Sequence, residues 1–206
     1  DAVEVLILAV KPHGVLPLIS SLSERGAELP LLISIAAAVS LDDMEACASD
    51  GTRIIRAMPN TPCMVLAGVI AYSTGNGVKD EDEEAARKLL SGCGSVYKVA
   101  ESGMNAVISG CGPAYMFTAL DALADAGVAM GLSRKTALGL AAETMRGASL
   151  MLERTGKHPM ALRDEVTSPG GTTIAALNAL DECGFRNAWI QAVKSAVRRA
   201  EEMEER

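Results

Sequence analysis

The run V-E-V-L-I-L-A-V at residues 3–10 is apolar at all but one position, contains several β-branched residues and ends at Lys11-Pro12. Such a run predicts a β-strand that is buried on both faces. Similar runs predict strands at residues 31–35 and 53–57, and M-P-N-T-P at residues 58–62 ends the second of these. Each of the three predicted strands therefore ends in proline or small residues.

The first hundred residues alternate between strand and helix signals. Helices are expected at about residues 15–25, 41–48 and 80–91, with Ser40 as the N-cap of the second, and short strands at residues 69–72 and 95–99. Strands and helices that alternate through short connections imply an open, mostly parallel sheet with helices on its faces. The sequence therefore predicts an α/β domain over residues 1–100.

The pattern changes near Ala100, where long helical segments replace strands. Helices are expected at about residues 102–109, 113–130, 133–155, 159–165, 169–182 and 185–202. The glycines and proline of G-C-G-P at residues 110–113 should kink or break the helical region there. We expect a second, all-α domain over residues 101–206, whose acidic run at residues 201–205 is a solvated tail.

The composition argues against several classes of protein. The 206 residues carry 19 Lys and Arg against 26 Asp and Glu, and the net charge of -7 disfavours nucleic-acid binding. Five scattered cysteines without a C-x-x-C pair fit a reducing, cytoplasmic compartment. With only His13 and His158 present, no metal site is expected. Asp121 and Asp125 interrupt the most apolar run, so no membrane span is expected either.

Three segments follow predicted strands and are candidates for a binding crevice, at residues 10–12, 34–38 and 58–62. Ligands of open parallel sheets bind outside the carboxyl ends of strands, where small residues permit close approach. Together the segments indicate a nucleotide-type ligand, although each alone is ordinary turn chemistry. No G-x-G-x-x-G occurs in the 206 residues. Either the ligand is different, or the first part of a dinucleotide domain lies outside this chain.

The stretch T-S-P-G-G-T-T at residues 167–173 is the sharpest local signal. Ser168 as N-cap and Pro169 in the first turn predict a helix start. The amides of Gly170, Gly171 and Thr172 would then have no partner within the helix, and with the helix dipole they suit a small carboxylate or phosphate. The alternative is a well-capped helix that binds nothing.

The chain resembles the pyrroline-5-carboxylate reductases of proline biosynthesis along its whole length. The resemblance rests on residues 9–13, 58–62, 109–115, 122–128, 157–159, 162–175 and 184–186. L-R-D-E-V-T-S-P-G-G-T-T-I-A at residues 162–175 is its most specific part. By this resemblance the first part of a Rossmann domain, with its glycine turn, is missing. We therefore expect an N-terminally truncated chain that is inactive alone.

The resemblance implies a partial Rossmann-like parallel-sheet domain followed by an all-α dimerisation domain. It implies reduction of 1-pyrroline-5-carboxylate to L-proline with NADP or NAD in reduced form, by a homodimer or higher homo-oligomer. Gly171 and Thr172 would bind the substrate carboxylate through backbone amides, and Thr173 would place its hydroxyl at the ring nitrogen as the catalytic residue. Five residues would lie along the nicotinamide and ribose end of the cofactor: Lys11, Pro12, Ala36, Ala37 and Asn60.

Three positions depart from the family pattern. Ala38 stands where the family usually has glycine, and a left-handed backbone there would cost alanine roughly 1 kcal/mol. Cys111 replaces a serine, and Leu66-Ala67 stands where a glutamate commonly precedes Gly68.

Two alternatives remain open on the sequence. One is a non-catalytic, dimerising remnant of such an enzyme. The other is a related hydroxyacid dehydrogenase, whose relatives carry a lysine on the long interdomain helix, whereas residues 99–133 contain no lysine.

Overall fold

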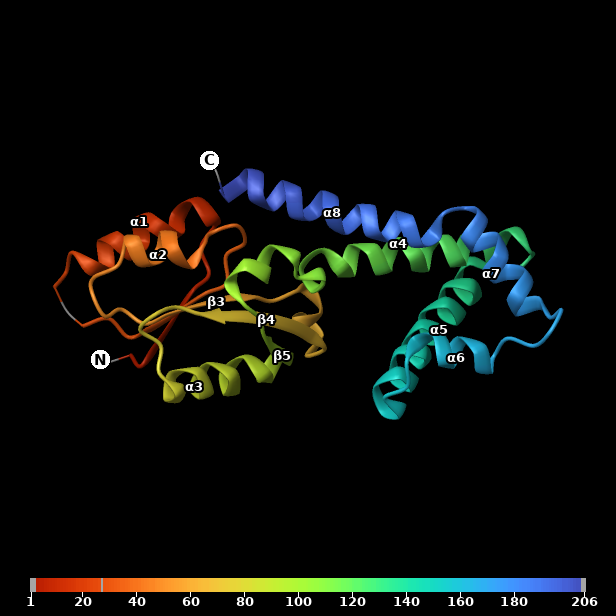
Figure 1. The fold of residues 1–206 in the computed structure, drawn as a ribbon, viewed down its shortest axis with the longest axis horizontal. Coiled ribbons are helices and arrows are strands. Elements are labelled where there is room, and N and C mark those ends of the chain that lie inside the picture. The colour runs from red at the N-terminus through yellow and green to blue at the C-terminus, as the bar shows by residue number, and fades with distance from the viewer. Residues whose placement is uncertain (1–2, 27, 205–206) are drawn as a thin grey trace. The chain divides into compact units, whose positions relative to one another are not determined.

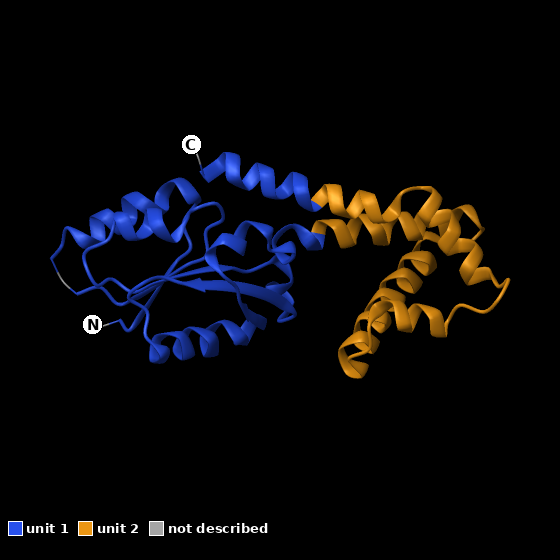
Figure 2. Cartoon of the chain, viewed as in Figure 1, with its two compact units in different colours: residues 1–113, 193–206 blue, residues 114–192 orange. Residues whose placement is uncertain are grey.

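The computed structural model describes residues 3–26 and 28–204. The chain forms two compact units, Asp1–Pro113 with Val193–Arg206, and Ala114–Ala192 (Figure 2). Compact units need not coincide with domains, so the division into domains at residue 100 stays a prediction.

The first unit is built on one five-stranded sheet whose strands lie in chain order (Figure 1). The strands are β1 (Val5–Leu8), β2 (Leu31–Ser34), β3 (Ile54–Met58), β4 (Gly68–Thr74) and β5 (Gly94–Lys98). The pairs β1–β2, β2–β3 and β4–β5 are parallel, and β3–β4 is antiparallel. The predicted mostly parallel sheet is therefore confirmed.

Helices cover both faces of this sheet. Helices α1 (Pro12–Ser23) and α2 (Leu41–Ala46) lie on one face and α3 (Asp80–Leu90) on the other (Figure 1). Strand alternation divides the core accordingly, because Leu32 packs with the α1 and α2 side chains whereas Ile33 packs with those of α3. The Ser40 hydroxyl accepts from the Asp43 N–H at 3.1 Å, which confirms the predicted cap of α2. Three short 3-10 helices also belong to this unit: η1 (Thr61–Val65), η2 (Ser91–Cys93) and η3 (Glu101–Ala106).

Strand β1 departs from the expectation of burial on both faces. Among the described residues β1 pairs with β2 alone, and its Ile7 side chain is 44% exposed. An apolar groove beside it is lined by Val3, Ile7 and Leu89 among others. The prediction was wrong because an apolar run reports which residues avoid water, not whether other elements of the chain cover both faces of the strand.

The rest of the chain is helical, and no strand follows β5 among the described residues. The helices are α4 (Ile108–Ala129), α5 (Arg134–Thr155), α6 (Pro159–Glu165), α7 (Thr172–Glu182) and α8 (Phe185–Glu204). The α/β region followed by an all-α region is thus confirmed. The helix expected at residues 102–109 is wrong, because η3 ends at Ala106 and α4 has begun by Ile108. Of the kink or break expected at residues 110–113, the break is wrong, because α4 continues through Pro113, and the kink stays a prediction.

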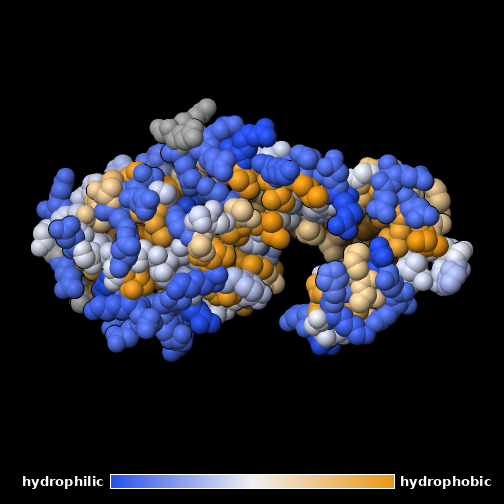
Figure 3. Space-filling view, viewed as in Figure 1, coloured by the Kyte–Doolittle hydropathy of each residue, from blue (hydrophilic) through white to orange (hydrophobic). Residues whose placement is uncertain are grey.

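The second unit buries little of its apolar surface by itself. Within Ala114–Ala192 the buried residues are Ala124, Ala137 and Ala141. Large apolar side chains such as Phe117 and Leu140 are more than half exposed. Figure 3 shows hydrophobic residues at the surface of this unit. Soluble proteins rarely expose so much apolar surface unless a partner covers it.

The segment Glu101–Ala129 is long and apolar enough to cross a membrane, judged by length and composition. The expectation that no run reaches this length is therefore wrong, since Asp121 and Asp125 alone do not lower the hydropathy enough. An apolar helix that packs against protein meets the same criterion, and this segment is also part of the helical region with the exposed apolar surface.

Candidate active site

The carboxyl ends of β1, β2 and β3 lie side by side at one edge of the sheet. Leu8 pairs with Ser34, and Ser34 pairs with Arg56, in parallel register. The Ile35 N–H also donates to the Leu8 carbonyl at 3.2 Å. The five candidate cofactor residues follow these three strands, so the structure brings their segments to the same edge.

Lys11 and Pro12 lie where β1 passes into α1. Lys11 is the N-cap and Pro12 the first helical residue, so α1 begins three residues before its expected start at residue 15. Proline fits this position because its missing N–H would have no partner in a first turn. Lys11 is exposed and makes no side-chain cap. The start of α1 therefore presents a cation and the positive end of a helix dipole at this edge.

Ala36 and Ala37 lie in the loop of residues 35–40 between β2 and α2. The Ala36 N–H lies 3.4 Å from the buried Ser34 Oγ, and Ala37 is exposed. Ala38 has φ 54°, so the left-handed backbone expected there is confirmed. Ala36 is buried, so the exposed Ala37 and the half-buried Ala38 are the alanines of this loop whose small side chains permit close approach.

Asn60 ties the loop after β3 to the start of α4. Its Oδ1 accepts from the Val69 N–H at 2.9 Å, and its Nδ2 donates to the Ser109 carbonyl at 3.1 Å. In a helix the N–H of residue 113 would take the Ser109 carbonyl, and Pro113 has none. The side chain of Asn60 therefore replaces the hydrogen bond that Pro113 removes, which explains why α4 continues through the proline. One N–H and one lone pair of Asn60 are left for a ligand.

The segment before α7 differs from the predicted helix start. The helix begins at Thr172 with Gly171 as its N-cap, so the start expected at Ser168-Pro169 is wrong. Residues 168–171 form a turn in which the Gly171 N–H donates to the Ser168 carbonyl at 3.1 Å. Gly170 has φ 66°, as a type II turn requires at the residue after proline. A Cβ on Gly171 would meet the Ser168 side chain and lie 3.2 Å from the Ser168 carbonyl oxygen, so Gly170 is the glycine that the turn requires and Gly171 eases its packing.

The amides available for an anion therefore lie two positions later than expected. The Gly171 N–H is used in the turn, which contradicts the expectation that it is free. The first N–H groups without an acceptor in the helix are those of Thr172, Thr173 and Ile174. Thr172 is exposed and Thr173 half-buried. The roles of Gly171, Thr172 and Thr173 toward a substrate stay predictions.

The candidate residues fall into two groups. The cofactor candidates belong to the first compact unit, and Gly171, Thr172 and Thr173 belong to the second. Each group is therefore described within its own unit.

A buried cation in β3 is the main feature that sequence analysis missed. Arg56 is 2% exposed and donates to Glu101 Oε1 at 2.7 Å and to Glu204 Oε1 at 3.1 Å. The acidic run at residues 201–205 is thus no simple solvated tail, because Glu204 ends α8 in an ion pair, while Glu205 lies outside the described residues. One arginine between Ile55 and Ala57 was the available signal, since a cation in an apolar strand needs a partner.

Tyr72 and Glu83, on the α3 face of the sheet, have shifted pKa values. Burial is the main cause that raises the pKa of Tyr72 to about 12, and its hydrogen bond to Glu83 adds to the shift. Hydrogen bonds from Lys98 and Tyr72 lower the pKa of Glu83. These groups stabilise the packing of α3 on the sheet.

Known proteins match this chain along nearly its whole length. The family described as "Pyrroline-5-carboxylate reductase dimerisation" matches residues 101–203. A pyrroline-5-carboxylate reductase of Arabidopsis thaliana is 42% identical over 202 residues, which cover 97% of this chain and 73% of the relative. The one from Synechocystis is 45% identical over 202 residues, with coverages of 97% and 75%.

A solved structure agrees with these sequence matches. The crystal structure of Plasmodium falciparum pyrroline carboxylate reductase with NADP bound matches with a TM-score of 0.90 and 30% identity. The match covers 98% of this chain and 77% of that one. The chain therefore spans about three quarters of the length of these relatives.

Proposed function

The chain belongs to the pyrroline-5-carboxylate reductase family, and we propose that its polypeptide as encoded reduces 1-pyrroline-5-carboxylate to L-proline with NADH or NADPH. The observation that carries the proposal is the start of α7, where amides without a helical acceptor lie beside the Thr173 hydroxyl. The substrate has one carboxylate, which the free amides suit, and one ring nitrogen, which the hydroxyl suits.

The substrate carboxylate would bind at the first turn of α7. The Thr172 and Thr173 amides are free to donate, and the positive end of the helix dipole favours an anion there. Gly171 would contribute by admitting the tight turn and the close approach of the ligand to the backbone. Thr173 would direct its hydroxyl to the ring nitrogen and so orient the C=N bond.

The residues at the sheet edge fit the nicotinamide end of a dinucleotide cofactor. The exposed Ala37 leaves the loop backbone accessible beside the buried Ala36, and the exposed Lys11 supplies a cation. Pro12 and the remaining amide groups of Asn60 would complete the contacts. The glycine turn that binds a diphosphate is not among the 206 residues. The NADP of the Plasmodium falciparum relative supports a nicotinamide cofactor, which would supply the hydride.

The chain needs no dedicated general acid for this chemistry. A C=N bond accepts hydride more readily when its nitrogen is protonated, and solvent can supply that proton. The residues of the site would hold the two reactants in line and exclude competing water. This agrees with the absence of a convincing His, Asp or Glu constellation in the sequence.

We place the protein in the cytoplasm as a homodimer or higher homo-oligomer, without nucleic-acid or membrane partners. The cysteines at positions 47, 63, 93, 111 and 183 are free thiols, as expected in a reducing compartment. The family model that matches residues 101–203 describes a dimerisation region. A second copy would cover the exposed apolar residues of the helical unit.

The two alternatives are less well supported. Identities of 42% and 45% along nearly the whole chain favour the reductase over a hydroxyacid dehydrogenase. A non-catalytic remnant predicts a folded dimer that converts no substrate, so an assay separates it from the reductase.

The test is product formation by the purified polypeptide as encoded. With pyrroline-5-carboxylate and NADH or NADPH, we expect the absorbance of the reduced cofactor to fall. One L-proline, identified by mass spectrometry, should form for each cofactor molecule oxidised. A folded protein that forms no proline would support the remnant instead. Cofactor oxidation with an oxo acid but not with pyrroline-5-carboxylate would support the dehydrogenase.

A further inference from the structure

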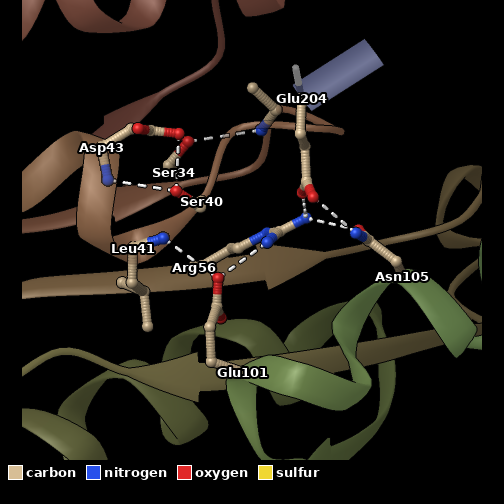
Figure 4. A network of polar contacts seen from close by, with 9 residues as sticks. Ser34, Ser40, Leu41, Asp43, Arg56, Glu101, Asn105 and Glu204 are labelled. Atoms are coloured by element: carbon tan, nitrogen blue, oxygen red, sulfur yellow. Dashed lines mark hydrogen bonds and ion pairs between the residues drawn. The ribbon is translucent and has the colours of Figure 1, made fainter. Parts of the chain in front are cut away.

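A buried ion-pair network lies beside the loop of residues 35–40, and the proposed reaction does not use it directly (Figure 4). Its centre is the Arg56 guanidinium, whose side chain is 2% exposed. Nη1 donates to Glu101 Oε1 at 2.7 Å, and Nη2 donates to Glu204 Oε1 at 3.1 Å. One buried cation thus joins η3 to the last turn of α8.

Asn105 forms hydrogen bonds with both Arg56 and Glu204. Its Oδ1 accepts from Arg56 Nη2 at 3.0 Å, and its Nδ2 donates to Glu204 Oε2 at 2.7 Å. Both carboxylate oxygens of Glu204 are therefore engaged. A carboxylate in the last turn of a helix is opposed by the helix dipole, so this glutamate needs a specific partner. Arg56 provides it.

Glu101 links the network to the candidate cofactor loop. Its Oε1, which already accepts from Arg56, also accepts from the Leu41 N–H at 3.0 Å. Leu41 is the first residue of α2, directly after the loop that contains Ala36, Ala37 and the left-handed Ala38. The contact between Ala36 and Ser34 Oγ lies at the other end of this loop. Glu101 therefore holds the end of the loop at which α2 begins.

We propose that Glu204 is a positioning residue for the cofactor site, acting through Arg56 and Glu101 on residues 35–40. The inference rests on the proposed function. Loss of the Glu204 charge would leave Arg56 Nη2 short of its anionic partner. Glu101 Oε2 is buried and has no hydrogen-bond partner among the described residues, so Glu101 can turn toward the guanidinium N–H that residue 204 then holds less strongly. That movement would release the Leu41 N–H and loosen the loop.

The consequence is a coupling between the end of the chain and cofactor affinity. The network contacts the loop that would receive the nicotinamide end, whereas the substrate carboxylate would bind at α7, which belongs to the other compact unit. Changes at Glu204 should therefore alter cofactor binding and spare turnover once the cofactor is saturating.

The experiment compares Glu204→Gln with Glu202→Gln in the polypeptide as encoded. Glu202 is a matched control, because its carboxylate pairs with Arg199 on the same helix and its side chain is 51% exposed. For Glu204→Gln we expect faster hydrogen exchange over residues 35–41, a Kd for NADPH or NADH raised by roughly 5-fold, and an unchanged kcat at saturating cofactor. Glu202→Gln should match the unsubstituted protein in all three.

The readouts separate positioning from mere stabilisation. A fall in melting temperature with unchanged loop exchange, or a looser loop with unchanged Kd, would overturn the inference. So would a Glu202→Gln variant that weakens cofactor binding equally. Failure of the unsubstituted protein to bind either cofactor would instead overturn the proposed function. The hydrogen-exchange comparison of the loop does not require bound cofactor, so it distinguishes the two failures.

Discussion

Arg56 is a fully buried cation with two carboxylate partners that are only partly covered, Glu101 and Glu204. Removal of one member of a buried ion pair leaves the others uncompensated, and such changes destabilise by about 3–5 kcal/mol. Because both carboxylates are more than a fifth exposed, water can reach them, and the lower end of this range applies. Arg56 therefore matters more to stability than any arginine at the surface.

We predict that Arg56→Met lowers the free energy of unfolding by about 3 kcal/mol. Arg53→Met is the matched control. Arg53 directly precedes β3 and pairs with Asp82 at 2.7 Å, but its side chain is 28% exposed. It should lose about 1 kcal/mol or less. Urea unfolding of both variants measures the difference, and equal losses would contradict a special role for Arg56.

Ala38 is strained where a glycine would not be. Its φ of 54° lies in the left-handed region, which costs alanine about 1–2 kcal/mol, part of which glycine would give back as greater freedom of the unfolded chain. We expect Ala38→Gly to raise the free energy of unfolding by about 0.5–1 kcal/mol. Ala37→Gly, next to it but without a positive φ, should lower it. A stability gain in both variants or in neither would contradict the strain at Ala38.

At the scale of elements, most of the fold could be predicted and the junctions could not. Strand and helix order followed from apolar runs and from caps such as Ser40, because these signals are local. The start of α7 was misplaced because Ser168-Pro169 suits a helix start and a proline–glycine turn equally well. Only the distant contact from Asn60 explains why α4 continues through Pro113.

The candidate site shows the same division. The strand ends and the threonines of α7 could be found from sequence, since the residues adjoin predicted elements. The pairing of Arg56 with Glu204 spans 148 positions in the chain, so no local pattern reveals it. Interactions at such separation depend on the tertiary fold.

The packing of α3 on the sheet should depend on pH through Tyr72. The Tyr72 hydroxyl donates to Glu83 Oε1 at 2.6 Å, and its pKa is raised from 10.0 to about 12. A folded pKa above the unfolded value adds stability that is fully present below pH 10.0 and is lost as pH rises through about 12.

We therefore expect the stability advantage of the unsubstituted protein over Tyr72→Phe to shrink as the pH rises from 10.0 to about 12. Val96→Ala removes packing from the same cluster without removing an ionisable group, so its deficit should stay constant over that range. Denaturant unfolding at several pH values provides the measurement. A constant deficit for Tyr72→Phe would show that the hydroxyl does not titrate as described.

At the scale of the whole molecule, the helical unit needs a partner to bury its apolar surface. Phe117 is 63% and Leu140 56% exposed, and the family match to a dimerisation region covers both. We predict a dimer at micromolar concentration by light scattering. Phe117→Glu and Leu140→Glu together should give monomers, because charges are not tolerated in a buried apolar interface.

Leu89→Glu provides the control for the dimer test. Leu89 is 48% exposed on α3, outside the helical unit, so this variant should remain a dimer. A monomeric unsubstituted protein, or a dimer that survives both helical substitutions, would contradict a partner at this surface.

The most direct measurement is the steady-state reduction of pyrroline-5-carboxylate by Thr173→Val and Thr172→Val in the polypeptide as encoded, with melting temperatures as a check on folding. Loss of the Thr173 hydroxyl should remove one hydrogen bond of about 1–3 kcal/mol, or roughly 5- to 150-fold in kcat/KM, with cofactor affinity unchanged. Thr172→Val keeps the amide that would bind the carboxylate and should lose less. Greater damage from Thr172→Val, or full activity in Thr173→Val, would contradict the placement of the substrate at the start of α7.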